Sequence, residues 1–389
     1  MTGPGATDAW DAFVATHPLA SYLQLSGWAR VKAANGWSSR LIQASTPGSE
    51  RIGGRLLLRT ASPLPWTFAY APRGPLADAW NEPALVVWTE AVRTALTTPP
   101  ARRIALLRMD PEIEPGGPLD PHRATAATLR ALGWRPAPEV QPSVTRLIDL
   151  APDEASLWSD LRKKWRQYIN RARSLGVTVT DEDADRDPTA LPTFHRLMRE
   201  TSRRTGTPIR TEEAYRDIWQ AFRAGGGARL LFARDAAGTP QAALLLVRAG
   251  RRVVEPYGGM TMLGAEQRAN YFLKWEAIRT SREQGASSYD LWGLVHPGIR
   301  QFKEGFGGRE VRLIGAWDLP LSGPGALAVR VAERLRRTPR PLTAATIETT
   351  TTSETAATTP TTSATETGTT GEMTATTEKT SAVPPSRNP

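Results

Sequence analysis

Cysteine is absent from this chain of 389 residues, and histidine occurs only four times, at positions 17, 122, 195 and 296. Without cysteine there is no disulfide, no thiolate nucleophile and no thiolate metal site. Four scattered histidines do not assemble a convincing zinc cluster. No apolar run approaches the roughly 18 residues of a membrane-spanning helix, and the N-terminus lacks the basic-then-apolar pattern of a secretory signal. The sequence therefore predicts a cytoplasmic protein that uses no metal or other cofactor.

Positive charge is in excess, because the net charge is +10. Residues 341–389 hold two basic residues and five Glu, so the remainder carries 47 basic and 34 acidic residues, a net charge of +13. Such a balance favours a polyanionic partner: a nucleic acid, an anionic membrane face or a phosphorylated small molecule. An Arg-rich composition that only keeps the protein soluble is the alternative.

The segment 341–389 is of low complexity, since 19 of its 49 residues are Thr, mixed with Ala, Ser and Glu. It contains too little apolar surface to offset the entropy lost on ordering. We therefore expect a disordered C-terminal tail that carries no chemistry.

The preceding part of the chain repeats one plan: a strand, a glycine-containing loop, a helix, a strand, a helix and a strand. The first copy is expected at 67–70, 82–96, 103–109, 121–132 and 143–150, and the second at 253–257, 266–284, 288–291, 298–305 and 310–317. Glycines at the predicted helix ends tolerate the positive φ found there. The pattern predicts an α+β fold of two halves related by duplication.

A basic helix is predicted between the copies, at 153–174. Leu161, Trp165, Ile169 and Ala172 recur at helical spacing and form one apolar stripe. The rest of this segment is rich in Arg and Lys and has no acid after Asp160. A solvated face usually mixes charges of both signs, so an anion-binding role is favoured over simple solvation.

Four motifs occur in order along the chain. They are Gln24-Leu-Ser-Gly-Trp28-Ala-Arg-Val-Lys32, Tyr70-Ala-Pro-Arg-Gly-Pro75, Arg204-Thr-Gly-Thr-Pro-Ile-Arg210, and Tyr289-Asp-Leu-Trp-Gly293 followed by Phe302-Lys-Glu-Gly-Phe-Gly-Gly308. Each is weak alone, but together they resemble the Fem family of aminoacyl-tRNA-dependent ligases that build the peptidoglycan cross-bridge. The resemblance covers roughly residues 20–319.

This resemblance implies two GNAT-like domains in tandem. Residues 8–150, completed by 309–337, would bind the muropeptide, and residues 151–308 would face the aminoacyl-tRNA. The enzyme would move an amino acid, with Gly, Ala or Ser favoured, from aminoacyl-tRNA to the stem-peptide amine of lipid II or UDP-MurNAc-pentapeptide. An ester donor is already activated, so neither ATP nor a covalent nucleophile is needed. We expect a monomer that contacts the cytoplasmic membrane face.

The resemblance also implies catalytic residues. Lys303 would stabilise the oxyanion or hold the tRNA terminus, although a lysine on a short surface helix is the alternative. Asp78 resembles a carboxylate proposed as the base in such enzymes, and an exposed loop carboxylate is an equal alternative. Proton transfer assisted by the substrate would need no protein base.

Binding residues are implied in the same way. Lys32 and one of Arg204 and Arg210 would bind the acceptor diphosphate. The remaining predicted substrate-binding residues are Trp28, Tyr70, Arg73, Tyr215, Tyr257 and Phe302, of which the aromatic ones could equally be core residues. The predicted tRNA-binding residues are Arg162, Lys163, Lys164 and Arg166.

Some family members insert a long helical arm near 199–215. This region is short here and contains Gly206 and Pro208, so no arm is expected. A GNAT-like fold also raises an acyl-CoA N-acyltransferase as an alternative, since 223–228 loosely matches an acyl-CoA pattern, although it precedes a predicted strand. A tRNA-dependent ligase with a natural-product or resistance-related acceptor and a non-catalytic basic binding protein are the other readings.

Overall fold

The structure is a computed structural model that describes residues 4–60, 65–98, 103–294 and 296–337. The predicted tail at 341–389 lies outside the described residues. Over the described ranges, no helix has the length and apolar character to cross a bilayer.

The elements follow the chain in two series. Up to residue 137 they are α1 (Pro4–Thr16), η1 (Tyr22–Gln24), α2 (Ser26–Ala33), β1 (Ser38–Ser45), β2 (Arg51–Thr60), β3 (Thr67–Ala71), β4 (Leu76–Ala77), α3 (Glu82–Thr97), β5 (Ile104–Met109), α4 (Thr125–Ala131) and β6 (Arg135–Ala137). The later ones are β7 (Val144–Asp149), α5 (Glu154–Asp160), α6 (Lys163–Ser174), β8 (Thr178–Glu182), α7 (Ala190–Thr205), α8 (Glu212–Phe222), η2 (Ala224–Gly226), β9 (Ala228–Arg234), β10 (Pro240–Ala249), β11 (Arg252–Met260), α9 (Met262–Glu266), α10 (Ala269–Glu283), β12 (Ser288–Asp290), α11 (Pro297–Glu304), β13 (Arg309–Arg312), β14 (Ala316–Pro320) and α12 (Gly323–Arg337).

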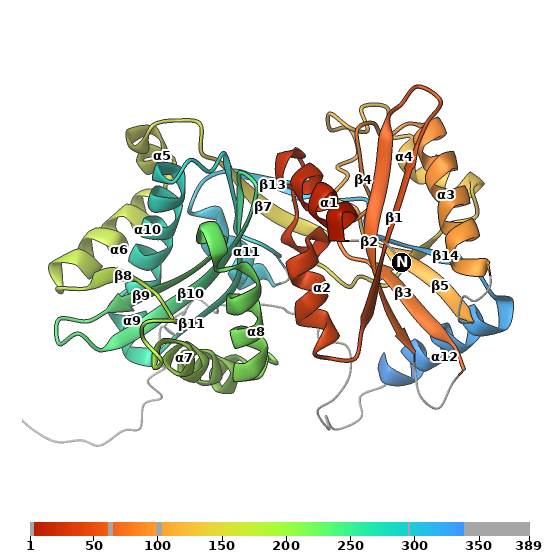
Figure 1. Cartoon of the computed structure of the whole chain (residues 1–389). Helices are drawn as coiled ribbons and strands as arrows, with labels where there is room; N and C mark the ends of the chain where they lie inside the picture. Colours follow the sequence, from red (N-terminus) through yellow and green to blue (C-terminus); the bar gives the residue numbers. More distant parts are fainter. Residues whose placement is uncertain (1–3, 61–64, 99–102, 295, 338–389) are drawn as a thin grey trace, which may run out of the picture. The chain divides into compact units, whose positions relative to one another are not determined.

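The strands form two sheets of the same design (Figure 1). The first has the order β1-β2-β3-β5-β14-β6, with β4 beside β2, and the second has the order β13-β7-β12-β11-β10-β9-β8. In each sheet one parallel pair follows the antiparallel strands, β3 with β5 and β11 with β12. A helix, α3 or α10, connects each parallel pair, as parallel pairing requires. The expected duplication is therefore confirmed at the level of topology.

The two halves exchange their closing strands. Although β6 and β7 are consecutive in the chain, β6 joins the first sheet and β7 the second. Likewise, β13 pairs with β7 in the second sheet, whereas the next strand, β14, pairs with β5 and β6 in the first. The expected boundary at residue 150 therefore does not coincide with the division between the sheets, because β7 precedes it. Of the segment 309–337, β13 belongs to the second sheet and β14 to the first.

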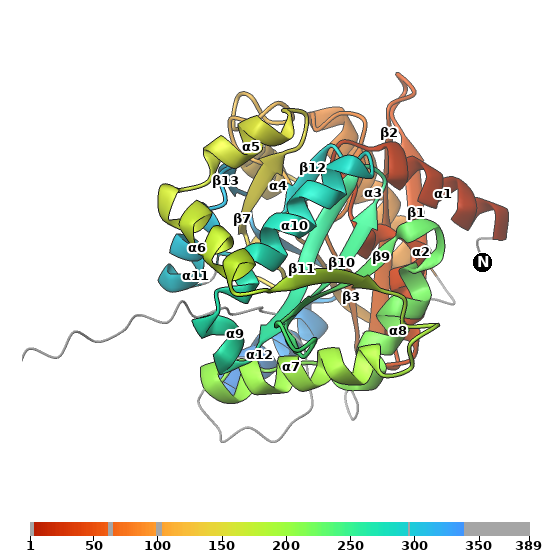
Figure 2. The same ribbon diagram turned by 90° about the vertical axis from the view of Figure 1, so that its left-hand side faces the viewer.

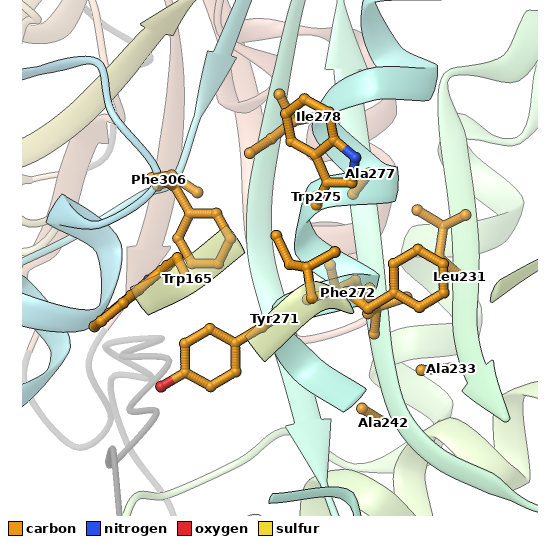
Figure 3. Packing of buried hydrophobic residues seen from close by; sticks show 14 of the residues in the cluster. Trp165, Leu231, Ala233, Ala242, Tyr271, Phe272, Trp275, Ala277, Ile278 and Phe306 are labelled. Atoms are coloured by element: carbon orange, nitrogen blue, oxygen red, sulfur yellow. The ribbon is translucent and has the colours of Figure 1, made fainter. Parts of the chain in front are cut away.

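Alternation along β9 and β10 gives the second sheet two apolar faces. Leu231 and Ala233 face α6 and α10, where they join Trp165, Tyr271 and Phe306 in one core (Figure 3). Their neighbours Leu230 and Phe232 belong to another core, which includes residues of α7 and α8. Figure 2 shows α6 and α10 in front of this sheet.

That second core continues into the N-terminal part of the chain. It contains Tyr22 and Trp28 from η1 and α2 and Leu57 from β2, together with Tyr257 and Trp292 from the second half. Helix α2 contacts β1 and β2 on one side and α8 on the other. The halves are thus joined by shared apolar burial, which is the dominant favourable term in packing.

The segment between the copies differs from the prediction, because 153–174 forms two helices instead of one. Leu161 adopts extended backbone angles and is 2% exposed. The next residue, Arg162, donates its backbone N–H to the carbonyl of Gly305 over 3.0 Å. Burial of Leu161 and this tertiary hydrogen bond stabilise a break that helical periodicity alone does not reveal.

The region considered for a helical arm forms α7 and α8. Helix α7 packs against β10 and β11, and α8 packs against α2 and β9. Since both helices bury one face in the body, neither is a projecting arm. The loosely acyl-CoA-like segment at 223–228 lies before β9 and includes η2, so it does not follow a strand.

Candidate functional site: a cation and aromatic cluster between the two sheets

Two predicted phosphate ligands stand at the same indole ring. Nζ of Lys32 lies 5.3 Å and Cζ of Arg210 5.7 Å from the ring centroid of Trp28. Lys32 and Trp28 are on α2, whereas Arg210 precedes α8, so the cluster joins distant segments of the chain. Both distances are within the range of cation–π attraction.

Two buried tyrosines accept hydrogen bonds from Arg210. Nε of Arg210 donates to the hydroxyl of Tyr257 over 3.0 Å, and its backbone N–H donates to the hydroxyl of Tyr215 over 3.4 Å. Both tyrosines are 1% exposed, so they act as core supports. Arg204, on the last turn of α7, shows no contact with this cluster among the described residues, and its Nη2 is buried without a hydrogen-bond partner. Of the predicted pair, the structure therefore brings Arg210 to the cluster.

Tyr22 connects this cluster to a second cation. Its ring lies 5.5 Å from that of Trp28 and 6.3 Å from that of Trp292. Cζ of Arg73 lies 5.1 Å from the Trp292 ring centroid. Sequence reasoning missed Tyr22 as a site residue, although it lies just before the Gln24–Lys32 motif.

The loop after β3 is held by buried polar groups. Gln24 donates from Nε2 to the carbonyl of Pro72 over 2.6 Å, and a Cβ at Gly74 would collide with the same amide. Asp110, which follows β5, accepts from the backbone N–H of Arg73 over 2.7 Å and from the Tyr70 hydroxyl over 2.6 Å. Arg73 thereby keeps a φ of +52°, which an L-residue rarely adopts.

Burial is the main influence on the pKa values of Asp110 and Tyr70. It raises the pKa of Asp110 to about 6, although Arg73 and Tyr70 oppose the increase. Burial also raises the pKa of Tyr70, and the neighbouring Asp110 charge adds to that increase. Tyr70 therefore remains a hydroxyl donor, and its role is to hold Asp110 and the Arg73 loop in place.

A buried chain of charges links the two sheets. Nε of Arg73 lies 3.1 Å from Oε1 of Glu112, which also pairs with Arg252 of β11. Arg252 in turn pairs with Asp290 of β12, which accepts the backbone N–H of Trp292 over 2.8 Å. Apart from Arg73, these residues were not predicted as site residues. Asp110 follows β5 and Asp290 ends β12, and these are the second strands of the two parallel pairs. An Asp at the end of this strand in both halves is the sequence signal that could have pointed to them.

Lys303 lies behind the Trp292 loop. Its side chain is nearly fully buried, and Nζ donates to the carbonyl of Gly293 over 3.1 Å. Since Gly293 follows Trp292, whose ring faces Arg73, the lysine is attached to the loop that borders the cluster. A surface location is therefore excluded.

The glycines around Lys303 allow close packing. A Cβ at Gly305 would overlap the indole of Trp165, whose Nε1 donates to the carbonyl of Phe302 over 3.0 Å. A Cβ at Gly308 would collide with the carbonyl of Leu147 in β7. Phe302 is 1% exposed and packs against Trp165, so it is a core residue that positions α11.

The predicted tRNA-binding residues occupy the start of α6. Arg162 pairs with Glu304 over 2.6 Å, next to Lys303 in the chain. Lys163 is exposed, Nζ of Lys164 lies 5.5 Å from the Tyr168 ring, and Nη1 of Arg166 donates to the carbonyl of Ser159 over 3.0 Å. Basic residues at a helix N-terminus oppose the helix dipole, so their placement does not serve helix stability.

Asp78 lies away from this cluster. It accepts from the backbone N–H of Arg51 over 2.8 Å and from Nε over 3.1 Å. The side-chain hydrogen bond from Arg51 is the main reason that the pKa of Asp78 is lowered. A carboxylate stabilised in this way is a weak base, which argues against the predicted catalytic role.

A cavity of about 430 Å³ opens beside Trp37, whose ring centroid lies 6.0 Å from Nζ of Lys32. It is lined by Gly36, Trp37, Ser38, Arg40, Leu58, Thr60, Thr67 and Ile104. Among the described residues, no group of three or more Asp, Glu and His side chains is placed to hold a metal ion.

The model of the FemAB family matches residues 6–234 and 228–334. The chain belongs to the FemAB family. A relative from Staphylococcus aureus, named lipid II:glycine glycyltransferase, is 28% identical over 232 residues, which cover 58% of this chain and 52% of the relative. The chain thus spans about half the length of the curated relatives it matches.

Solved structures show the same fold as this FemAB family member. The crystal structure of FemX superposes with a TM-score of 0.74 at 22% identity, over 85% of this chain and 99% of that chain. A conserved protein of unknown function from Bacteroides thetaiotaomicron gives a TM-score of 0.52 at 13% identity, over 82% of this chain and 98% of that one. The predicted α+β fold of two domains of the same design in tandem is confirmed.

Proposed function

We propose that this protein is an aminoacyltransferase that moves an amino acid from aminoacyl-tRNA to the stem-peptide amine of a peptidoglycan precursor. The observation that carries the proposal is that Lys32 and Arg210 both lie close to the Trp28 ring centroid, at 5.3 Å and 5.7 Å. Two cations at one aromatic ring suit a diphosphate, which both UDP-linked and lipid-linked precursors contain. The name of the S. aureus relatives favours a lipid-linked acceptor and glycine as the transferred residue.

The reaction would be aminolysis of an ester. The acceptor nitrogen forms a bond to the ester carbonyl carbon, the carbon–oxygen bond to the tRNA ribose breaks, and the amine proton ends on the ribose hydroxyl. Lys303 would oppose the negative charge that develops on the carbonyl oxygen. Because Arg51 stabilises the ionised form of Asp78, we favour a proton transfer that the substrate itself assists.

The two halves would divide the work. The first sheet holds the Arg73 loop, and its helix α2 holds Lys32 for the acceptor. The second half presents Lys303 together with the basic first turn of α6, and the Arg162–Glu304 pair keeps these two elements adjacent. A polyanionic tRNA end would meet Lys163 and Lys164 without first breaking a buried contact.

The decisive experiment is incubation of the full chain with a mixture of charged tRNAs and lipid-linked muropeptide, read by mass spectrometry. A mass increase on the muropeptide supports the proposal and identifies the amino acid. Arg210→Lys should lower transfer more than Arg204→Lys, because only Arg210 stands at Trp28. No addition to either a lipid-linked or a UDP-linked precursor would refute the function.

A further inference from the structure

The outer face of α12 carries large apolar side chains in a row. Leu327, Val331 and Leu335 follow one another at intervals of four residues, so they share one helix face. Their exposed fractions are 61%, 45% and 69%. Three such residues on one face form a continuous exposed stripe, which soluble surfaces usually avoid.

The opposite face of α12 fixes the helix to the first sheet, so the orientation of the stripe is determined. Ala326 is 1% exposed, and a Cβ at Gly325 would collide with Trp66 and with the backbone of Ala105 beside it. Glu333 accepts from Nη1 of Arg108 over 2.7 Å. Figure 1 shows α12 in blue at the edge of the first half.

A basic cavity adjoins the stripe. It measures about 260 Å³ and lies between α12 and the strands β6 and β14. Its lining includes Arg135, Arg330 and Arg334, and its two acids, Asp318 and Glu333, are both paired with Arg108. Within the described residues, no ion pair is formed by the three arginines of this lining, so their charge is available to an anion.

We propose that the α12 face, defined by Leu327, Val331, Arg330, Arg334 and Arg135, docks on an anionic phospholipid surface. The apolar stripe would enter the boundary between headgroups and acyl chains, while the arginines contact lipid phosphates. An amphipathic helix with arginine beside its apolar stripe is the form that interfacial binding takes. The docking does not depend on the proposed transfer reaction, but it would bring that reaction to a lipid-linked acceptor.

Charge favours a lipid surface over two other occupants. A second copy of this chain, paired face to face, would bring the same arginines against one another within a body of net charge +13. The chain beyond Arg337 contains Leu342, Ile347, Met373 and Val383 as its only large aliphatic residues and no aromatic ones. It offers little apolar surface to cover the stripe.

The test is co-sedimentation of the full chain with vesicles of phosphatidylglycerol and phosphatidylcholine in equal parts, compared with phosphatidylcholine alone. Binding should be strong only on the anionic vesicles and should weaken with salt. The double variant Leu327→Ser/Val331→Ser should bind about tenfold more weakly. Arg330→Ala/Arg334→Ala should lose about fivefold per arginine.

Matched controls use exposed residues elsewhere. Met262→Ser/Leu263→Ser removes two exposed apolar side chains of α9, and Lys163→Ala/Lys164→Ala removes two cations of α6. Both control variants should bind vesicles as the parent does, and all variants should keep the parent's melting temperature, since the altered side chains are exposed. A chain that ends at Arg337 should also retain binding.

The proposal is overturned if the α12 variants bind anionic vesicles as the parent does, or if the α6 variant alone loses binding. Loss of binding on removing residues 338–389 would assign the vesicle contact to that segment. A change of the α12 variants only in oligomeric state would assign the stripe to contact with a second copy. Since vesicle binding is measured without tRNA or muropeptide, failure of transfer on every acceptor would refute the proposed reaction and leave the docking result standing.

Discussion

Gly305 lies so close to the indole of Trp165 that a Cβ at position 305 would overlap ring atoms Cε2, Nε1 and Cδ2. We predict that Gly305→Ala displaces α11 from α6, destabilises the protein by about 1–3 kcal/mol and lowers any activity that depends on Lys303. Chemical denaturation measures the loss of stability. Gly298→Ala is the control on the same helix, because a Cβ there would lie 3.6 Å from Nδ1 of His296. Equal stability of the two variants would contradict the packing argument.

Lys303 is the residue on which the proposed chemistry depends. Lys303→Ala, or Lys303→Met, which keeps most of the methylene chain, should reduce turnover by on the order of 10²-fold, because the charge that we propose opposes the oxyanion is lost. Single-turnover rates with charged tRNA measure this reduction, and circular dichroism establishes that the variants are folded. Arg300→Met on the same helix is the control, since Arg300 pairs with Glu310 and not with the loop at Gly293. Normal turnover without the lysine would remove it from the mechanism.

The charges that link the sheets should matter for stability. Arg252→Met leaves Asp290 buried without its cation and should cost about 3–5 kcal/mol in the free energy of unfolding. Arg309→Ala removes an exposed partner of Glu114, 2.7 Å away, and should cost at most about 1 kcal/mol. Denaturant titration of both variants provides the comparison. Similar losses would mean that the buried network adds nothing beyond a surface pair.

Asp110 should make stability depend on pH. Its folded pKa of about 6 lies above the ordinary value of 3.8. The folded state therefore holds the proton more tightly, and the resulting stability is present below pH 3.8 and lost as the pH rises through 6. Relative to Asp110→Asn, the parent should lose roughly 3 kcal/mol of unfolding free energy across this window. The exposed Asp160→Asn variant is the control, and parallel pH profiles of the parent and Asp110→Asn would refute the assignment.

Much of the fold could be predicted because its signals are local. Glycines such as Gly133 and Gly307, both with positive φ, follow α4 and α11, which occupy equivalent places in the two copies. The placement of β7 in the second sheet could not be predicted, because its sequence specifies an extended segment but not the sheet that it joins. The break at Leu161 likewise depends on a carbonyl of Gly305, 144 residues further on in the chain.

The structure brings Lys32, Trp28 and Arg210, which come from two of the sequence motifs, close together, and Arg73 lies near them through Trp292 and Tyr22. Their role in binding stays a prediction. Arg252 was missed because it resembles any basic residue at a strand start until its buried partners are known. Tyr215, Tyr257 and Phe302 are buried, which fits the core alternative given for the aromatic residues, and their contact with substrate stays a prediction.

The exchanged strands impose an order on synthesis. A chain emerging from the ribosome makes β5 long before β14, the strand that pairs with it, so this edge of the first sheet stays open until residue 320 has been translated. In the second sheet, β7 is translated before its partners β12 and β13, so this sheet can be completed once β13 has been made. The half that begins the chain is therefore the last to finish folding. A gene fragment that stops after the second sheet would leave β5 as an unprotected edge, open to pairing with another molecule.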